Sequence, residues 1–384
     1  MQQVRIGIIG IGNMGSGHLK NLQEGKVPEM AVGAVCDVKP ERLQFVKETY
    51  GDIPCFESAE ELMNSGLVDA VFIAVPHYSH PPLAMMAMKK GLHVMCEKPA
   101  GVYTKQVKEM NAVAKTCNVK FGMMFNQRTN CVYRKMHELV HSGKYGEIRR
   151  TNWIITDWYR TQSYYDSGEW RATWAGEGGG VLLNQCPHQL DLWQWICGMP
   201  EKILAKMQFG HWHDIEVEDD VTCFATYKNG ATGVFVTSTG DAPGTNRFEI
   251  TLDKAKLVCE NGELTLYEND VPCSVHIKTE KHGFKKPELT ETKVETDGEN
   301  LQHIGVLRAF AAAILRNEPM VADGSEGMNG LTISNAMHLS AFLNREVTLP
   351  IDDDLYYSEL QKRVASSRRK TGVVEQVANT EGTY

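Results

Sequence analysis

The sequence lacks the features that tie a protein to a membrane or a nucleic acid. Across its 384 residues, no apolar run approaches the roughly 18 residues that a membrane span requires. Lysine and arginine total 40 against 48 aspartates and glutamates, and no basic face is evident. We therefore expect neither nucleic acid nor an anionic membrane as a partner. The sequence also has no internal repeat and no low-complexity segment.

Paired cysteines are missing as well. The ten cysteines are scattered, several within apolar runs, and no C-x-x-C pair indicates a zinc or redox site. Dispersed cysteines of this kind are typical of buried, reduced thiols. The first apolar run begins at Val4, which leaves no room for a signal peptide. We expect a cytoplasmic protein with no metal site.

A glycine-rich turn follows that first run. Residues 4–9 are nearly all apolar and β-branched, which predicts a central parallel strand. They lead into a G-x-G-x-x-G motif, after which residues 16–23 can form a helix. Gly10 permits the tight turn, Gly12 lets the backbone approach a pyrophosphate, and Gly15 lets the helix pack on the strand. The motif predicts a dinucleotide site at the helix N-terminus, with Asn13 and Met14 beside it.

An acidic residue ends the second apolar strand, residues 31–36. Asp37 lies about twenty residues after the last glycine, where a carboxylate accepts hydrogen bonds from the adenosine ribose and repels a 2′-phosphate. Lys39 could tolerate that phosphate, but we interpret it as a solvated residue at a helix start. We therefore predict NAD, rather than NADP, as the cofactor.

Apolar runs and helical segments alternate up to residue 125, which is typical of a parallel sheet with crossover helices. We predict a doubly wound, six-stranded Rossmann domain over residues 1–125. The predicted helices are residues 40–50, 57–63, 81–90 and 104–117, and the later strands are residues 69–75, 91–96 and 119–125. The strand through Ala74 leads into Pro76 and His77, which we expect against the nicotinamide half of the cofactor. A metal pair of His77 with His80 is the weaker interpretation, because His80 suits a helix start.

A charged turn, Glu97-Lys98-Pro99, ends the strand over residues 91–96. The carboxyl end of a buried strand is where an open α/β sheet binds its ligands. Pro99 ends the strand pairing and fixes the backbone, so the Lys98 side chain is presented at a sharp turn. Such a turn alone is usually no active site. Combined with the glycine loop and a histidine downstream, it indicates one.

Residues 126–350 predict a second α/β domain. Short turns separate consecutive strands there, which indicates a large, mostly antiparallel open sheet. The predicted strands are residues 148–156, 203–209, 221–227, 232–239, 247–252, 256–260, 263–267 and 274–279. The predicted helices are residues 133–142, 303–316 and 327–344, and residues 285–300 are predicted to be a surface loop. Residues 351–384 read as a C-terminal helix and a solvated tail.

Three consecutive glycines, residues 178–180, precede an apolar helix that starts beside His188. Glycines let backbone come close to a bound ligand. An imidazole at a helix start, with a pKa near neutrality, suits proton transfer. A lone histidine of this kind is usually structural, but together with Lys98 it predicts a catalytic group.

An aromatic segment precedes these glycines. Seven aromatic residues fall within 22 positions, and they are Trp153, Trp158, Tyr159, Tyr164, Tyr165, Trp170 and Trp174. Aromatic faces stack on the C–H faces of sugars, while charged and amide groups hold hydroxyls, so a pyranose or cyclitol site is indicated. For any single residue, a place in the core or at an oligomer interface is an equal alternative. The predicted substrate-binding residues are Asn126, Trp158, Trp170, Arg171, Trp174, Asn184, His188 and Asp191.

Together, these motifs resemble the glucose-fructose oxidoreductase / inositol dehydrogenase / MocA (Gfo/Idh/MocA) family. The matching segments are the glycine motif, Asp37, Ala74-Val75-Pro76, Glu97-Lys98-Pro99, residues 178–191 and Asp323-Gly324-x-Glu326-Gly327. The resemblance covers roughly residues 4–350. It implies a Rossmann domain followed by an α/β domain with a large open sheet. In the family, the face of this sheet usually forms an oligomer contact. We therefore expect a homo-oligomer, either a dimer or a tetramer.

The family usually has an aspartate four residues before the histidine, as part of a proton relay, and this chain has Asn184 there. An amide can orient the ring or bind a substrate hydroxyl, but it cannot stabilise an imidazolium by charge. Asp191, one turn beyond His188, could take part of that role or stabilise the helix start. The predicted catalytic residues are thus Lys98, His188 and Asn184, and the predicted cofactor-binding residues are Gly10, Gly12, Asn13, Met14, Gly15, Asp37, Ala74, Pro76, His77, Glu97 and Lys98.

We interpret the chain as an NAD-dependent dehydrogenase that acts on a ring secondary alcohol of a sugar, glycoside or cyclitol. His188 would accept the hydroxyl proton, and Lys98 would hold the same oxygen. Two alternatives remain open. One is an NAD-dependent glycosidase that works by transient oxidation and elimination. The other is a non-catalytic dinucleotide-binding sensor or regulator, which would need neither Lys98 nor His188.

Overall fold

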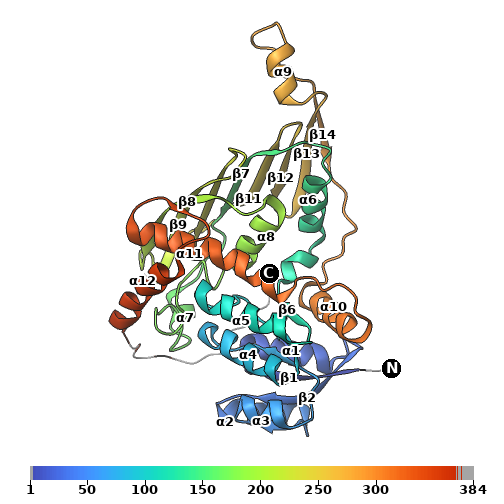
Figure 1. Ribbon diagram of the computed structural model, residues 1–384, viewed down its shortest axis with the longest axis vertical. Helices are drawn as coiled ribbons and strands as arrows, with labels where there is room; N and C mark the ends of the chain where they lie inside the picture. Colours follow the sequence, from blue (N-terminus) through green and yellow to red (C-terminus); the bar gives the residue numbers. More distant parts are fainter. Residues whose placement is uncertain (1–2, 369, 371–372, 374–384) are drawn as a thin grey trace.

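Six parallel strands form the first sheet (Figure 1), in a computed structural model that describes residues 3–368, 370 and 373. Their order is β3-β2-β1-β4-β5-β6, and each neighbouring pair is parallel. The strands are β1 (Val4–Ile9), β2 (Met30–Cys36), β3 (Cys55–Phe56), β4 (Ala70–Ile73), β5 (His93–Cys96) and β6 (Phe121–Met123). The apolar sequences of β1 and β4 are almost wholly buried, as expected for strands covered on both faces.

Helices connect these strands and complete the predicted Rossmann domain. They are α1 (Asn13–Gln23), α2 (Pro40–Tyr50), α3 (Ala59–Asn64), α4 (His80–Lys89) and α5 (Thr104–Thr116), with the short 3-10 helix η1 (His77–Ser79) before α4. The chain order reverses between β1 and β4, because β2 lies on one side of β1 and β4 lies on the other. Ligands of doubly wound sheets bind at such a switch point. The prediction of six strands gave residue ranges for five of them, and the range of β3 was missed because its two residues carry no detectable period.

Nine strands form the second sheet, in the order β14-β13-β12-β11-β7-β10-β9-β8-β15. Only the neighbours β7 and β10 run parallel, so the prediction of a mostly antiparallel sheet is confirmed. The strands are β7 (Ile148–Ile155), β8 (Lys202–Phe209), β9 (Glu218–Thr226), β10 (Thr232–Ser238), β11 (Asn246–Leu252), β12 (Ala255–Glu260), β13 (Glu263–Asn269), β14 (Leu289–Lys293) and β15 (Val347–Thr348).

Two predictions between residues 274 and 300 are wrong. Residues 274–279 are not a strand but belong to α9 (Cys273–Thr279), and the predicted surface loop contains β14. The hydrophobic pattern reveals neither element, because α9 buries no residue and every residue of β14 is exposed. Backbone pairing with β13, rather than burial of side chains, holds β14 in place.

Helices cover one face of the second sheet (Figure 1), and the remaining helices connect it to the first domain. They are α6 (Cys131–His141), α7 (Gln162–Tyr165), α8 (Pro187–Cys197), α10 (Gln302–Arg316), α11 (Gly327–Leu343) and α12 (Asp353–Ser366), with the 3-10 helices η2 (Asn126–Thr129) and η3 (Gly324–Glu326). On the opposite face, Ile154, Leu204 and Phe224 are 40 to 43% exposed. This second face is therefore partly apolar and uncovered in the single chain.

One helix does not follow the predicted domain boundary. Val306, Leu307 and Phe310 of α10 are buried in the same cluster as Ile6 and Phe72 of the first sheet. α10 thus completes the core of the Rossmann domain from the far side of the sequence. Among the described residues, no helix is both long and apolar enough to cross a membrane.

Candidate active site

A cavity of about 930 Å³ runs from the glycine loop to the aromatic segment of the second domain. The carboxyl ends of β2, β4 and β5 line one side of it, at the switch point of the first sheet. The predicted site residues that line it are Gly10, Gly12, Asn13, Met14, Asp37, Ala74, Pro76, His77, Glu97, Lys98, Trp158, Trp170, Arg171, Asn184 and His188. Gly15, Asn126, Trp174 and Asp191 are not among the lining residues.

The glycine loop has the geometry that a dinucleotide needs. Gly10 has a φ of +95°, and a Cβ there would lie 2.4 Å from the backbone oxygen of Ala74. A Cβ on Gly15 would lie 1.8 Å from the oxygen of Gly10, so this glycine lets α1 pack on the loop without lining the cavity. A Cβ on Gly12 meets nothing within 4 Å, and no side chain of the described residues caps α1. The first N–H groups of α1 therefore fit a pyrophosphate.

Asp37 lies at the other end of the loop. Its two carboxylate oxygens accept hydrogen bonds from the backbone N–H of Ile11, at 2.7 Å, and of Lys39, at 2.9 Å. These bonds fix the carboxylate at the end of the cavity where the adenosine would lie. Lys39 and Arg42 line the same end, and Arg42 was not predicted. This end of the cavity therefore carries both signs of charge.

A buried hydrogen-bond chain supports Lys98. The backbone N–H of Lys98 donates to Oε2 of Glu97 at 3.1 Å, and Oε1 of Glu97 lies 3.0 Å from Nε2 of His18 on α1. Burial alone would raise the pKa of Glu97, but the hydrogen bond with His18 and nearby positive charge lower it to about 2. Glu97 is therefore a buried anion, 4% exposed, held directly beside Lys98.

His18, Glu97 and His303 form the group of described residues whose spacing could hold a metal ion. One possible ligand atom from each lies within 4.8 Å of the others. The sequence gives no sign of this cluster, because its members are far apart in the chain. The direct hydrogen bond between His18 and Glu97 already uses one possible ligand atom of each residue, and nothing further in the structure points to an ion.

Lys98 lines the cavity next to the segment that leads to His188. Its Nζ donates to the backbone oxygen of Asn184 at 2.9 Å. Burial lowers the pKa of the ammonium, while the negative charges of Glu97 and Glu177 oppose that shift. Burial and the charge of Lys98 also lower the pKa of His188 well below its ordinary value. At neutral pH the cavity therefore holds a lysine donor and an uncharged imidazole.

Asn184 is at the centre of a polar network in the cavity wall. Its Nδ2 donates to Oε1 of Glu177, and its Oδ1 accepts a hydrogen bond from the Tyr164 hydroxyl at 3.2 Å. Nη1 of Arg171 donates to the same hydroxyl at 3.0 Å. Glu177 is 2% exposed, and burial raises its pKa. Glu177 was not predicted, because its only local signal is its place directly before the glycine run.

Aromatic rings and arginines alternate along the side of the cavity that the second domain forms. The guanidinium of Arg171 lies 4.8 Å from the ring centre of Trp170 and 4.7 Å from that of Tyr164. Arg160 lies 5.2 Å from the Tyr164 ring and 5.7 Å from the Trp158 ring. Trp158, Trp170 and both arginines line the cavity. The wall therefore presents flat apolar faces edged by positive charge.

Two residues predicted to bind substrate make other contacts. The Asn126 side chain is buried and donates to Oε1 of Gln302 at 2.5 Å. Trp174 is 6% exposed and packs edge-on against His338 and Phe342. Asn126 therefore joins η2 to the start of α10, Trp174 packs against α11, and neither residue lines the cavity.

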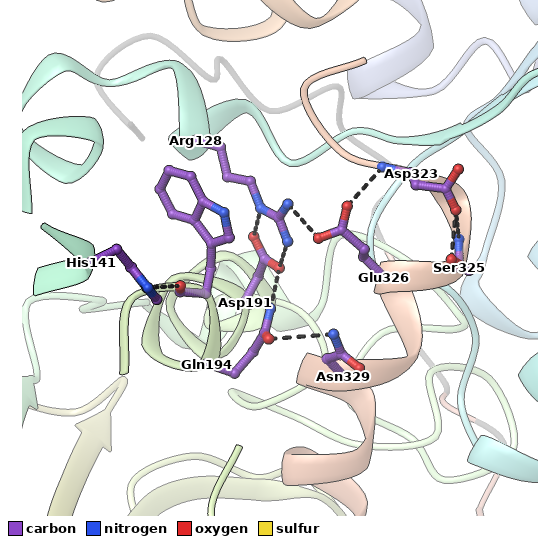
Figure 2. Close-up of polar contacts among 9 residues, drawn as sticks. Arg128, His141, Asp191, Gln194, Asp323, Ser325, Glu326 and Asn329 are labelled. Carbon is purple, nitrogen blue, oxygen red and sulfur yellow. Dashed lines mark hydrogen bonds and ion pairs between the residues drawn. The ribbon is translucent and has the colours of Figure 1, made fainter. Parts of the chain in front are cut away.

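Asp191 binds a buried arginine (Figure 2). Its carboxylate accepts two hydrogen bonds from Arg128, at 2.6 and 2.8 Å, and the same guanidinium donates to Glu326 at 2.7 Å. Gln194, on the same helix, donates to Asp191 at 3.1 Å and accepts a hydrogen bond from Asn329 of α11 at 3.3 Å, which is a second link between α8 and its neighbours. Arg128 thus joins η2, the helix that carries His188 and the start of α11. We find Asp191 here as a structural partner and not at the cavity.

Two family models match the chain. Residues 4–125 match a model described as an oxidoreductase family with an NAD-binding Rossmann fold, and residues 133–258 match the Gfo/Idh/MocA C-terminal domain. The chain belongs to the Gfo/Idh/MocA oxidoreductase family. This confirms the resemblance seen in the sequence motifs.

Named relatives of this Gfo/Idh/MocA protein align over most of their length. The myo-inositol 2-dehydrogenase of Thermotoga maritima is 24% identical over 357 residues, which are 90% of this chain and 98% of the relative. The D-glucoside 3-dehydrogenase of Escherichia coli is 25% identical over 84% of this chain and 91% of its own. The crystal structure of the WlbA dehydrogenase from Chromobacterium violaceum, with NADH and UDP-GlcNAcA, has a TM-score of 0.79 at 25% identity and covers 92% of this chain and 97% of its own.

The relay position of this Gfo/Idh/MocA chain differs from the expected family pattern in one residue. Asn184 stands where the sequence resemblance leads us to expect an aspartate, and the structure places the Glu177 carboxyl against its amide. An acidic group is therefore present one hydrogen bond further from the cavity. Its charge also raises the pKa of the Lys98 ammonium against the effect of burial.

We expect Arg128→Met to lower the free energy of unfolding by roughly 3–5 kcal/mol, because it leaves the Asp191 carboxylate buried without a partner. Glu326→Gln is the matched control, since the Glu326 side chain is 36% exposed and should contribute less than about 1 kcal/mol. Urea unfolding followed by tryptophan fluorescence measures both. Equal losses for the two variants would contradict a dominant Arg128–Asp191 pair.

Proposed function

We propose that this protein is an NAD-dependent dehydrogenase that acts on a ring secondary alcohol of a sugar, glycoside or cyclitol. The observation that carries the proposal is the meeting of Lys98 and His188 in a cavity continuous with the glycine loop. The relatives named for myo-inositol and for a D-glucoside support a ring alcohol as the substrate. The WlbA structure holds NADH and a sugar nucleotide, which supports a carbohydrate as the class of substrate.

The mechanism follows from the charges of the two residues. His188 is uncharged at neutral pH because its pKa is depressed, so an imidazole nitrogen can accept the proton of the substrate hydroxyl. Lys98 Nζ holds the same oxygen by a hydrogen bond and stabilises the negative charge that develops on it. A bound nicotinamide supplies the hydride acceptor. Asn184 and Glu177 fix the segment whose backbone oxygen accepts from Lys98.

The cavity wall favours a ring over an open chain, and an uncharged sugar over a phosphorylated one. The faces of Trp158 and Trp170 can stack on the C–H face of a pyranose or cyclitol. The arginines of the wall are engaged with aromatic rings and, for Arg171, with the Tyr164 hydroxyl. Their remaining N–H groups can hold hydroxyls at the ring edge.

We also propose a homo-oligomer formed through the uncovered face of the second sheet. Leu204 and Phe224 are directly paired neighbours on β8 and β9, and Ile154 lies on the same face of β7. A contiguous apolar patch of this kind marks an interface. All ten cysteines are free, which suits a reducing compartment, and we propose the cytoplasm.

The substrate class is tested by incubating the protein with NAD and matched sets of inositols, free hexoses, glycosides, hexose phosphates and linear polyols. We expect NADH to form with ring substrates and to form weakly or not at all with linear polyols, which stack poorly. NADH formed mainly from linear polyols or sugar phosphates contradicts the stacking argument. Release of aglycone without net NADH instead assigns the redox-cycling glycosidase.

Lys98→Met and His188→Ala should each lower kcat at least about a hundredfold, the usual scale for losing an oxyanion or proton-transfer partner. NADH affinity should change little, because the glycine loop is intact. Lys90→Met and His211→Ala, at exposed positions outside the cavity, are the controls.

The pH profile adds a second measurement. Because the pKa of His188 is lowered, kcat/KM should keep its plateau down to pH 6.5 and fall only below it, and it should fall again as rising pH deprotonates Lys98.

Asp37→Asn should shift the cofactor preference from NAD towards NADP by about tenfold, since one charge interaction near a protein surface is worth on the order of 1.4 kcal/mol. The amide keeps a hydrogen-bond acceptor but no longer repels a 2′-phosphate, while Arg42 remains. Dissociation constants of both cofactors, with Asp52→Asn as the control, decide the point. Tighter binding of NADP than of NAD to the unaltered protein refutes the assignment of Asp37.

A further inference from the structure

The segment between β13 and β14, residues 270–288, projects from the end of the second sheet farthest from the first domain (Figure 1). It contains α9, and we call it the arm. α9 buries none of its residues. Hydrogen bonds from Ser274 to Asp253 hold its first turn, but α9 gains little stabilisation from burial within its own chain.

Apolar side chains of the arm and of β14 are unusually exposed. Phe284 is 102% exposed, Ile277 71% and Leu289 60%, with Val275 at 48%. The uncovered face of the second sheet reaches only 43% at Phe224. Single exposed apolar residues are normal, but four within fifteen positions on one protrusion indicate a contact surface.

The charges of this region are separated into two neighbouring stretches. Residues 276–286 carry four lysines and one glutamate, whereas residues 288–299, which we call the acidic strip, carry five acidic residues and one lysine. On the arm, Lys278, Lys281 and Lys286 are exposed, and on the strip, Glu288, Glu291 and Glu295 are exposed. Within residues 3–368, none of these six side chains has an ion-pair partner.

The acidic strip includes an open edge. β14 is the last strand of its sheet, it pairs only with β13, and all its residues are exposed. Its charged side chains oppose direct pairing with another strand. A basic and apolar segment laid across this edge would both cover it and neutralise it.

We propose that the arm of one copy packs across the acidic strip of a second copy, related to it by a two-fold axis. A two-fold interface needs one surface that is complementary to itself, and this chain carries a basic arm next to an acidic strip. The chain as a whole has a net charge of -8, so its own surface supplies the acidic partner that the arm fits. The contact lies at the sheet edge and is additional to the open sheet face.

Charge reversal provides the test. One variant carries Lys278→Glu, Lys281→Glu and Lys286→Glu, and the other carries Glu288→Lys, Glu291→Lys and Glu295→Lys. Each alone places like charges in both halves of the contact, so its assembly mass, measured by light scattering at moderate salt, should fall to about half. Mixed in equal amounts, the two variants should recover the original mass, because arm and strip then carry opposite charges in both contacts.

Three further measurements complete the test. Ile277→Asp with Phe284→Asp should give the same loss of mass, whereas Lys89→Glu, Lys115→Glu and Lys228→Glu together, at exposed positions elsewhere, should not. Unchanged NADH binding shows that each variant is folded. The mass measurements do not depend on catalytic activity, so they can fail or succeed independently of the proposed enzymatic function. The proposal is overturned if the unaltered chain is monomeric, if the arm variants keep its mass, or if the mixture does not recover it.

Discussion

A positive charge in a partly buried cavity needs negative partners, and the arrangement of this site depends on how Lys98 obtains them. Glu97 lies directly beside it, Asn184 offers a backbone oxygen, and Glu177 adds a second negative charge. Glu97 is in turn held by His18 on α1, the helix that begins at the glycine loop. The glycine loop and the lysine of the cavity are therefore connected through one buried carboxylate.

The same ammonium also determines the state of its neighbour. Its charge adds to burial in lowering the pKa of His188, so the ammonium that donates to Asn184 also favours the uncharged imidazole. The opposite side of α8 is fixed by Arg128, whose bonds to Asp191 and Glu326 leave little freedom for the helix start. Contacts outside the cavity thus fix the position of the imidazole, and the charge of Lys98 inside the cavity lowers its pKa.

Local signals explain most of what the sequence could predict. The glycine motif, the strand that ends at Lys98 and the helix start at His188 are each encoded within about ten residues, and the cavity contains all three. His18 and Glu177 were not predicted, because their roles arise only when distant or turn-separated segments meet. α9 and β14 were assigned wrongly for a related reason. Their residues are exposed, so the alternation of buried and exposed positions that distinguishes a strand from a loop is missing.

The return of α10 to the first sheet has a consequence for how the two halves of this chain can be recombined. Val306, Leu307 and Phe310 fill a core that is otherwise built from the first third of the sequence. A fragment that ends at residue 125 would expose that core to water. A chimera that exchanged only the first 125 residues would pack α10 of one protein against the first sheet of another. The modules of this protein are therefore contiguous in space but not in sequence, and grafting its cofactor domain requires α10 to be transferred with it.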